Sequence, residues 1–241
     1  MNKAKYALIA AYVMFSVSAF SQKLENTLKV NVSSLALKNF SFQYERGLTK
    51  HVSFALGVRV EPKGNIPLQS LAENVFDKGD FNLDALQMGN TAITPEIRFY
   101  LGTGRNRGFY IAPYARYAKF NLTLPVTFTT NSGQDQALFD GHVTSFSGGV
   151  LFGMQYTFGK VIVLDIWMLG GHYGSSNGNA IFTPSEPLSN DEQQGLRDKL
   201  NGISIKPFTF TSTVSSSGAT IATTGPWVGL RALGINLGVR F

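Results

Sequence analysis

The stretch that decides the fold is "GHVTSFSGGVLFGMQYTFGK", residues 141–160, in which a large apolar residue falls on nearly every second position. A period of two residues predicts a β-strand with one apolar face and one polar or small face. The apolar face holds Phe146, Val150, Phe152, Met154, Tyr156 and Phe158, and the other holds Ser145, Ser147, Gly149, Gly153, Gln155 and Thr157. Which of the two faces meets water decides the class of protein.

Composition narrows the fold class before any motif is considered. The 241 residues are 15% charged and 12% aromatic and include 25 glycines, which is typical of a Gly-rich β protein. Beyond the N-terminus, no apolar run reaches the about 18 residues that a membrane-spanning helix needs. The absence of cysteine excludes disulfides, thiolate metal sites and a Cys nucleophile. Without Lys3 and Lys5 of the N-terminal signal expected below, 19 basic and 15 acidic residues leave a net charge of +4, which is too mild to predict a nucleic-acid partner.

The N-terminus has the pattern of a cleaved export signal over residues 1–21. Lys3 and Lys5 precede an apolar run from Tyr6 to Val17, and Ala19-Phe20-Ser21 places small residues at the −3 and −1 positions before Gln22. An uncleaved helical anchor is the alternative, and it would need about 20 apolar residues. We therefore expect residues 22–241 to form one exported domain.

Eight segments of the remaining chain have strand-like patterns. They cover residues 26–36, 39–48, 50–62, 91–101, 108–128, 141–158, 161–173 and 227–241. Several reach the about 9–11 residues that a tilted strand needs to cross a bilayer. The connections alternate between short turns (47–50, 102–107, 159–160) and long loops (63–90, 174–226), with one short turn at Lys38-Asn39 on the long-loop side. This asymmetry is typical of outer-membrane barrels.

In several strands, charged residues lie on the face opposite the large apolar residues. In strand 91–101, Glu96 and Arg98 lie opposite Ile93, Ile97 and Phe99. A soluble sandwich would spread its charges freely over an outward face, whereas here an unbroken apolar band stands opposite a small, mostly neutral face. That pattern predicts lipid outside and a polar lumen inside. The expected fold is all-β, a transmembrane antiparallel up-and-down β-barrel of about eight strands with long extracellular loops.

On these residues the chain resembles the small eight-stranded outer-membrane β-barrels of Gram-negative bacteria, of the OmpA and OmpX type. It resembles more closely a group of barrel proteins of unknown function that carry "KVN", "YER" and "PEIRFYLG" in their strands, here Lys29–Asn31, Tyr44–Arg46 and Pro95–Gly102. The resemblance implies a place in the cell outer membrane, with contacts to its lipid and lipopolysaccharide. It also implies that the barrel-assembly machinery reads the final strand, "GINLGVRF", which ends on Phe241.

The period of two also predicts which charges face the lumen. They are Glu45, Arg59, Glu96, Arg98, Arg116, Asp165 and Arg240. The interior of an eight-stranded barrel is just wide enough for side chains to fill it, and an unpaired buried charge is strongly destabilising. We therefore expect a salt-bridged plug. The alternative is a path for protons or a solute, since ionisable residues at membrane depth are functional candidates.

The sequence predicts no enzyme, no metal site and no cofactor. His51, His142 and His172 are widely spaced and fit no metal-binding motif. The run His172–Asn177 is similar to the His-x-Ser-Asn run of outer-membrane lipid A deacylases, in which the His acts as base for the Ser. Here Gly174 occupies the position at which that spacing requires Ser. If the strand continues, Ser175 lies on the face opposite to His172. A lipid A-modifying enzyme therefore remains only as a second alternative.

The long segment 174–226 is the main candidate for recognition. Ser189 followed by Glu192 forms a capping box that predicts a surface helix over 190–201, closed by Gly202. The Thr/Ser-rich run from Thr209 to Thr224 either extends the flanking strands as a β-ribbon or stays mobile. The candidate contacts for lipopolysaccharide phosphates are Arg197, Lys199, Lys206 and the rim residue Arg231.

These observations favour a structural or surface-interaction protein that meets an unknown extracellular ligand through its loops. Transport of a small hydrophobic molecule, as in OmpW-like barrels, is the alternative. It would require an apolar lumen near the top of the barrel and a lateral opening, and the charged strands argue against it.

Overall fold

The computed structural model describes residues 26–65, 85–130, 133–202 and 206–241. The expected export signal over 1–21 and its cleavage before Gln22 therefore lie outside the described residues. Within the described part of the chain, no helix is long and apolar enough to cross a membrane.

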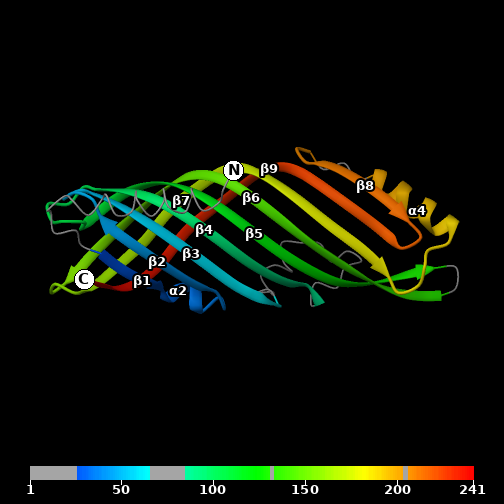
Figure 1. Ribbon diagram of the computed structural model, residues 1–241, viewed down its shortest axis with the longest axis horizontal. Helices are drawn as coiled ribbons and strands as arrows, with labels where there is room; N and C mark the ends of the chain where they lie inside the picture. The colour runs from blue at the N-terminus through cyan, green and yellow to red at the C-terminus, as the bar shows by residue number, and fades with distance from the viewer. Residues whose placement is uncertain (1–25, 66–84, 131–132, 203–205) are drawn as a thin grey trace, which may run out of the picture.

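Eight antiparallel strands close into a ring (Figure 1). Each strand from β1 to β6 pairs with the next, and β9 pairs with both β7 and β1. The ring strands are β1 (Asn26–Asn31), β2 (Phe40–Gly47), β3 (Val52–Asn65), β4 (Gln87–Tyr100), β5 (Gly108–Thr130), β6 (Gly133–Phe158), β7 (Ile162–Pro184) and β9 (Gly218–Arg240). The predicted antiparallel up-and-down β-barrel of about eight strands is confirmed.

The two faces of the quoted stretch lie as its period predicts. On β6, Ser145, Ser147 and Gln155 are buried in the interior of the ring. Phe146 and Phe152 alternate with them and are 63% and 49% exposed on the outer surface. The same alternation holds on β5, where buried Tyr110 and Ala112 flank exposed Ile111. The apolar face therefore points outward and the polar face inward.

Short turns close one end of the barrel, which we call the short-turn end. It holds the β2–β3, β4–β5 and β6–β7 turns, and the C-terminus lies there in Figure 1. Asn106, in the β4–β5 turn, donates its backbone N–H to the carbonyl of Lys50 at 3.1 Å. Its own carbonyl accepts a hydrogen bond from Gln155 Nε2 at 3.0 Å. The β4–β5 turn is thus tied to the β2–β3 turn and to the lumen.

At the opposite end, two hairpins extend past the ring (Figure 1). The β5–β6 ladder runs to Thr130↔Gly133, and the β7–β9 ladder runs to Phe182↔Ala219. The ends of the predicted 174–226 loop are therefore strand. Residues between them form α4 (Asn190–Asn201) and β8 (Thr209–Ser215), and β8 pairs with β9. The predicted helix, its capping box and the β-ribbon are all confirmed.

The predicted strand 26–36 is wrong over its last five residues, because β1 ends at Asn31. The Asn31 side chain accepts a hydrogen bond from the Ser34 N–H at 2.8 Å and caps a one-turn helix, α2 (Val32–Leu35). Lys38 then takes a left-handed backbone, with a φ of 55°, and leads into β2. The N-capping hydrogen bond therefore determines the local structure here, although the apolar pattern of the segment predicts a strand.

The early end of β1 leaves part of β9 without a neighbour on one side. β1 pairs with β9 only along Asn236–Arg240, and β8 pairs with it only along Gly218–Thr224. Among the described residues, no strand pairs with that side of residues 225–235. Ser33 Oγ accepts a hydrogen bond from the backbone N–H of Ile235 at 3.1 Å. We call this opening, between β9 at 225–235 and α2, the wall gap.

Two irregularities beside the wall gap exchange the inward and outward faces. The β6–β7 register shifts by one residue at Phe152/Gly153, which makes Met168 a bulge on β7. On β9, Leu233 has a left-handed backbone with a φ of 53°. Between Leu233 and the C-terminus, even-numbered residues such as Asn236 face the lumen. Before Leu233, odd-numbered residues such as Arg231 face it instead.

Candidate functional site

The lumen near the short-turn end holds five buried charged side chains, which we call the lower charge cluster. They are Lys29, Glu45, Glu96, Arg98 and Asp165, each at an inward position of β1, β2, β4 or β7. Arg98 pairs with Asp165 at 2.7 Å, with Glu96 at 2.9 Å and with Glu45 at 3.3 Å. Lys29 pairs with Asp165 at 2.8 Å and also with Glu45. Two cations thus bridge three carboxylates.

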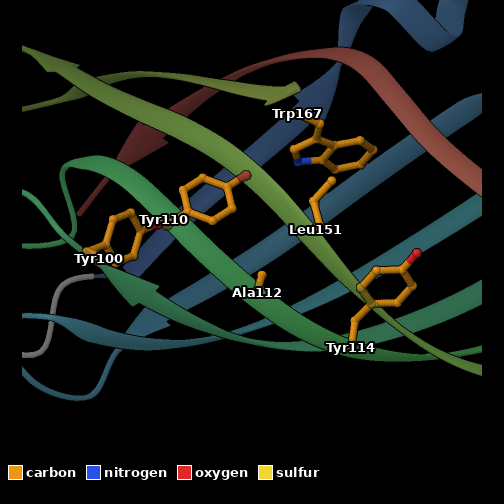
Figure 2. Packing of buried hydrophobic residues seen from close by; sticks show 6 residues of the cluster. All are labelled: Tyr100, Tyr110, Ala112, Tyr114, Leu151 and Trp167. Atoms are coloured by element: carbon orange, nitrogen blue, oxygen red, sulfur yellow. The ribbon is translucent and has the colours of Figure 1, made fainter. Parts of the chain in front are cut away.

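Neutral groups complete the lower charge cluster. Tyr110 donates its hydroxyl to Asp165 at 2.7 Å, and Tyr100 donates its hydroxyl to Glu45 at 2.6 Å. The two rings are neighbours in Figure 2, and their centroids are 5.3 Å apart with the planes tilted by 57°. The Arg98 guanidinium lies 4.5 Å from the centre of the Tyr110 ring and donates to Gln43 Oε1 at 2.8 Å. Charges and aromatic rings therefore fill this half of the lumen.

Arg231 balances the third carboxylate from above. Its Nη1 lies 2.8 Å from Glu96 Oε1. The guanidinium sits between two rings, 4.7 Å from the centre of Tyr114 and 4.4 Å from that of Trp167, both visible in Figure 2. Its side chain is only 8% exposed, so Arg231 does not lie at the rim as the sequence predicted. The left-handed backbone at Leu233 is the reason, since it exchanges the two faces of β9.

Above the lower charge cluster, Arg59, Arg116 and Arg231 form what we call the upper arginine cluster. All three line a cavity of about 400 Å³ together with His172. Arg116 donates to Thr94 Oγ1 at 3.0 Å. In the described part of the chain, neither Arg59 nor Arg116 has a carboxylate within 4 Å, although Glu61 acts on Arg59 from a longer distance. The charges of Arg59 and Arg116 therefore lack close counterions.

The rest of the cavity wall is polar around α2, at Asn31, Ser33, Ser34 and Asn39, and mainly apolar along β5 and β9. Phe120 on β5 and Trp227 on β9 stack with ring centroids 5.1 Å apart. Leu37, which follows α2, lines the side that faces the wall gap, as do Leu230 and Leu233 of β9. The cavity therefore combines a cationic part in the lumen with an apolar part that reaches the wall gap.

The remaining predicted site residues lie apart from both clusters. Arg240 is half-buried at the short-turn end, where Nη2 donates to the Asn106 carbonyl at 3.4 Å. Phe241 exchanges two backbone hydrogen bonds with Asn26, both at 2.9 Å, and so extends the β1–β9 closure. Arg197 donates to the Val214 carbonyl at 3.2 Å and holds α4 against β8, while Lys199 and Lys206 are exposed.

The histidine of the deacylase-like run faces away from the neighbouring serine. His172 is buried in the lumen, with Nδ1 3.0 Å from the Tyr114 hydroxyl, whereas Ser175 lies on the outer face. Ser176 faces inward and donates to the Gly225 carbonyl at 3.2 Å. In the part of the chain that the structure describes, no group of three His, Cys, Asp or Glu side chains could hold a metal ion.

Sequence reasoning missed two cations of the lumen. Lys29 lies between Leu28 and Val30, so the period of two could have placed it inside. Arg231 gave no such signal, because counting back from Arg240 in steps of two places it outside. Only the backbone at Leu233 brings it into the lumen.

No curated protein and no solved structure matches this chain. The sequence pattern of one family, described as "Protein of unknown function (DUF3575)", matches residues 7–180. The match includes β1 to β6 and most of β7, and it ends before α4, β8 and β9. The match covers well over half of the chain, so the chain belongs to the DUF3575 family.

Proposed function

We propose that the protein is an integral barrel of the bacterial outer membrane, of the small OmpA and OmpX-like kind. The observation that carries the proposal is the apolar outer surface over a charged interior. Phe42, Ile97 and Phe152 belong to strands around the ring, and each is nearly half exposed. An apolar surface of this extent is a liability in water, whereas a closed barrel satisfies its backbone groups in lipid.

The lower charge cluster supports a barrel that does not conduct. Its ion pairs and tyrosines occupy the lumen, and the β4–β5 turn covers the short-turn end. Breaking such a cluster to open a pore would expose buried charges that now satisfy one another. We therefore propose a structural and display role for the ring itself.

The extended hairpins supply the surface-interaction role. β8 continues the sheet beyond the ring and α4 lies against β8, in a region where loops and projecting elements commonly carry recognition. Lys199 and Lys206 are exposed there and suit the phosphates of lipopolysaccharide. The proposal includes no catalysis, since His172 and Ser175 face opposite sides of the sheet.

Transport of a small hydrophobic molecule is a second candidate, and the wall gap favours it. Such transport requires a lateral opening near an apolar part of the lumen. The cavity beside Phe120 and Trp227 reaches the wall gap and meets that requirement. The lower charge cluster argues against passage onward to the short-turn end.

The membrane location can be tested with single fluorescent labels, because the chain has no cysteine. A label on Ile97→Cys, at the outer face of β4, should be quenched by phospholipids brominated along their acyl chains. A label on Lys199→Cys, on α4, is the matched control and should be quenched much less. Unboiled protein should also migrate differently from boiled protein in detergent gels. Equal quenching at both positions, or recovery from cells as a soluble periplasmic protein, would contradict the proposal.

The display role can be tested by removing the segment beyond the strands. Replacing residues 185–217 with a short Gly-Ser linker keeps β7 and β9 intact and should leave a heat-modifiable barrel. Binding to lipopolysaccharide micelles should fall, and the Lys199→Ala/Lys206→Ala variant should reproduce part of the loss. Full binding by the truncated protein would contradict the role of this segment.

A further inference from the structure

The cavity beside the wall gap passes from the lumen to the outside of the barrel. Trp227, Gly229 and Arg231 face the lumen and line it. Leu230 and Leu233 of the same strand also line it, although they are 79% and 81% exposed on the outer side. Residues from both faces of one strand can line one cavity only if the cavity passes around the edge of that strand. The unpaired edge at 225–235 permits this.

The wall gap lies within the apolar outer surface. Val228, Leu230 and Leu233 border it on β9, and Leu35 and Leu37 border it near α2, all of them exposed. A sheet edge that faces lipid is normally paired or covered, because its backbone groups find no water there. Leu233 also holds a left-handed backbone, which is costly for a branched residue and is commonly found at functional sites. Both features indicate a place that receives a ligand.

The cationic part of the cavity indicates the charge of that ligand. Arg231 is paired with Glu96, whereas Arg59 and Arg116 have no close counterion among the residues that the structure describes. The positive charges of Arg59 and Arg116 repel each other, and the charge of Arg231 repels both. Planar guanidinium groups that converge on one space match the oxygens of a carboxylate or a phosphate. An anionic group would relieve the repulsion and accept hydrogen bonds from the two guanidinium groups.

The apolar part indicates the rest of the ligand. A cavity of about 400 Å³ falls in the usual range for small molecules, roughly 300–1,000 Å³. Phe120 and Trp227 form its wall, and the leucines of β9 lead to the outer surface. A molecule with an anionic head and one long alkyl chain satisfies both parts at once. Its head would meet the arginines while its chain leaves through the wall gap into lipid.

We propose that the wall gap is a binding site for a single-chain anionic amphiphile, either a long-chain carboxylate or a monoalkyl phosphate. Arg59 and Arg116 bind the head, and the alkyl chain passes Leu230 and Leu233. This goes beyond the display role and rests on the proposed membrane location only for the source of the ligand. The lower charge cluster closes the lumen beneath the head, so the molecule enters and leaves by the side.

The test uses the full mature chain folded in a neutral detergent. Cis-parinaric acid, a fluorescent long-chain carboxylate, should bind with one site per barrel. Palmitate and hexadecyl phosphate should both displace it, and the stronger of the two identifies the preferred head. Hexadecanol, which has the same chain and no charge, should compete at least about tenfold more weakly. Inorganic phosphate, a head without a chain, should not compete at concentrations at which hexadecyl phosphate does.

Variants separate head recognition from folding. Arg59→Met and Arg116→Met should each weaken binding by about tenfold or more, as expected for losing a hydrogen bond to a charged group. Arg59→Lys keeps the charge and should restore part of the affinity. Lys160→Met removes an exposed cation from the β6–β7 turn and is the matched control, with unchanged binding. Heat-modifiable migration in gels shows which variants have folded.

A further pair of variants locates the entrance. Leu230→Glu places a carboxylate at the wall gap and should lower the affinity for cis-parinaric acid. Ile97→Glu places the same group on the outer face of β4 and should leave the affinity unchanged. No saturable binding to the folded barrel would overturn the proposal. So would equal competition by palmitate and hexadecanol, or unchanged binding by the double variant Arg59→Met/Arg116→Met. None of these results would bear on membrane insertion, which the quenching experiment tests separately.

Discussion

The two halves of the lumen use the same kinds of residue in opposite ways. In the lower charge cluster, Arg98 contacts the carboxylates of Glu45, Glu96 and Asp165. In the upper arginine cluster, Arg116 has Thr94 as its hydrogen-bond partner and other arginines as electrostatic neighbours. The first half is filled, and the second lines a cavity that reaches the outside.

The difference separates charge that holds a fold from charge that recognises a ligand. Where every buried charge has partners, losing one leaves the others unsatisfied, so the cluster is needed for stability. Where like charges gather without counterions, they weaken the fold slightly and favour an added anion. The sequence alone put Arg98 and Arg116 in one lumenal group, and their surroundings set them apart.

The largest effect should come from Arg98→Met. The variant leaves three buried carboxylates with Lys29 and Arg231 as their remaining cations. We expect a loss of about 3–5 kcal/mol in the free energy of unfolding, which is typical of a broken buried ion pair. Urea titration of the barrel in lipid vesicles, followed by gel migration, measures it. A loss below about 1 kcal/mol, the size of a surface ion pair, would mean that the lower charge cluster does not hold the barrel together.

Glu96→Gln should have a smaller but clear effect, because Glu96 joins the two halves through Arg98 and Arg231. The amide keeps hydrogen-bonding capacity and removes the negative charge. The expected loss is about 1.5–3 kcal/mol, the usual contribution of a hydrogen bond to a charged group. Glu61→Gln, at a half-exposed position of β3, is the matched control and should change little. Equal effects of the two variants would remove Glu96 from its linking role.

Ser189→Ala should affect the display segment alone. The Ser189 hydroxyl accepts a hydrogen bond from the Glu192 backbone N–H, and the Ser189 backbone N–H donates one to the Glu192 carboxylate. Loss of the cap should destabilise α4 by about 1 kcal/mol. Hydrogen exchange should quicken in α4 and stay unchanged in the ring. A drop in the unfolding midpoint of the whole barrel would show that the segment is coupled to the ring.

The regular parts of the fold could be predicted because period-two patterns in long strands are strong signals. The stretch 141–160 gave the correct faces, and Ser189 with Glu192 gave the correct helix. Glu45, Glu96, Arg98 and Asp165 were also predicted in the lumen from parity. Lys29 follows the same rule, so its place in the lumen could also have been predicted from the sequence.

The wall gap could not be predicted, because it depends on local backbone conformations. Asn31 caps α2 and ends β1 early, although the apolar pattern continues to residue 36. Leu233 adopts a left-handed backbone that its residue type disfavours, and this turns Arg231 inward. A pattern that counts every second residue fails at such points. The upper arginine cluster therefore emerges only in three dimensions.

The smallest expected effect gives the most direct test of the contrast between the two halves of the lumen. The free energy of unfolding should be measured for Arg116→Met and Arg98→Met in the same vesicles, without added amphiphile. Arg116→Met loses one hydrogen bond to Thr94 and relieves repulsion from Arg59 and Arg231, so its stability should stay within about 1 kcal/mol of the native protein. Arg98→Met should be about 3–5 kcal/mol less stable. Similar losses in the two variants would contradict the division of the lumen into a part that holds the fold and a part that binds a ligand.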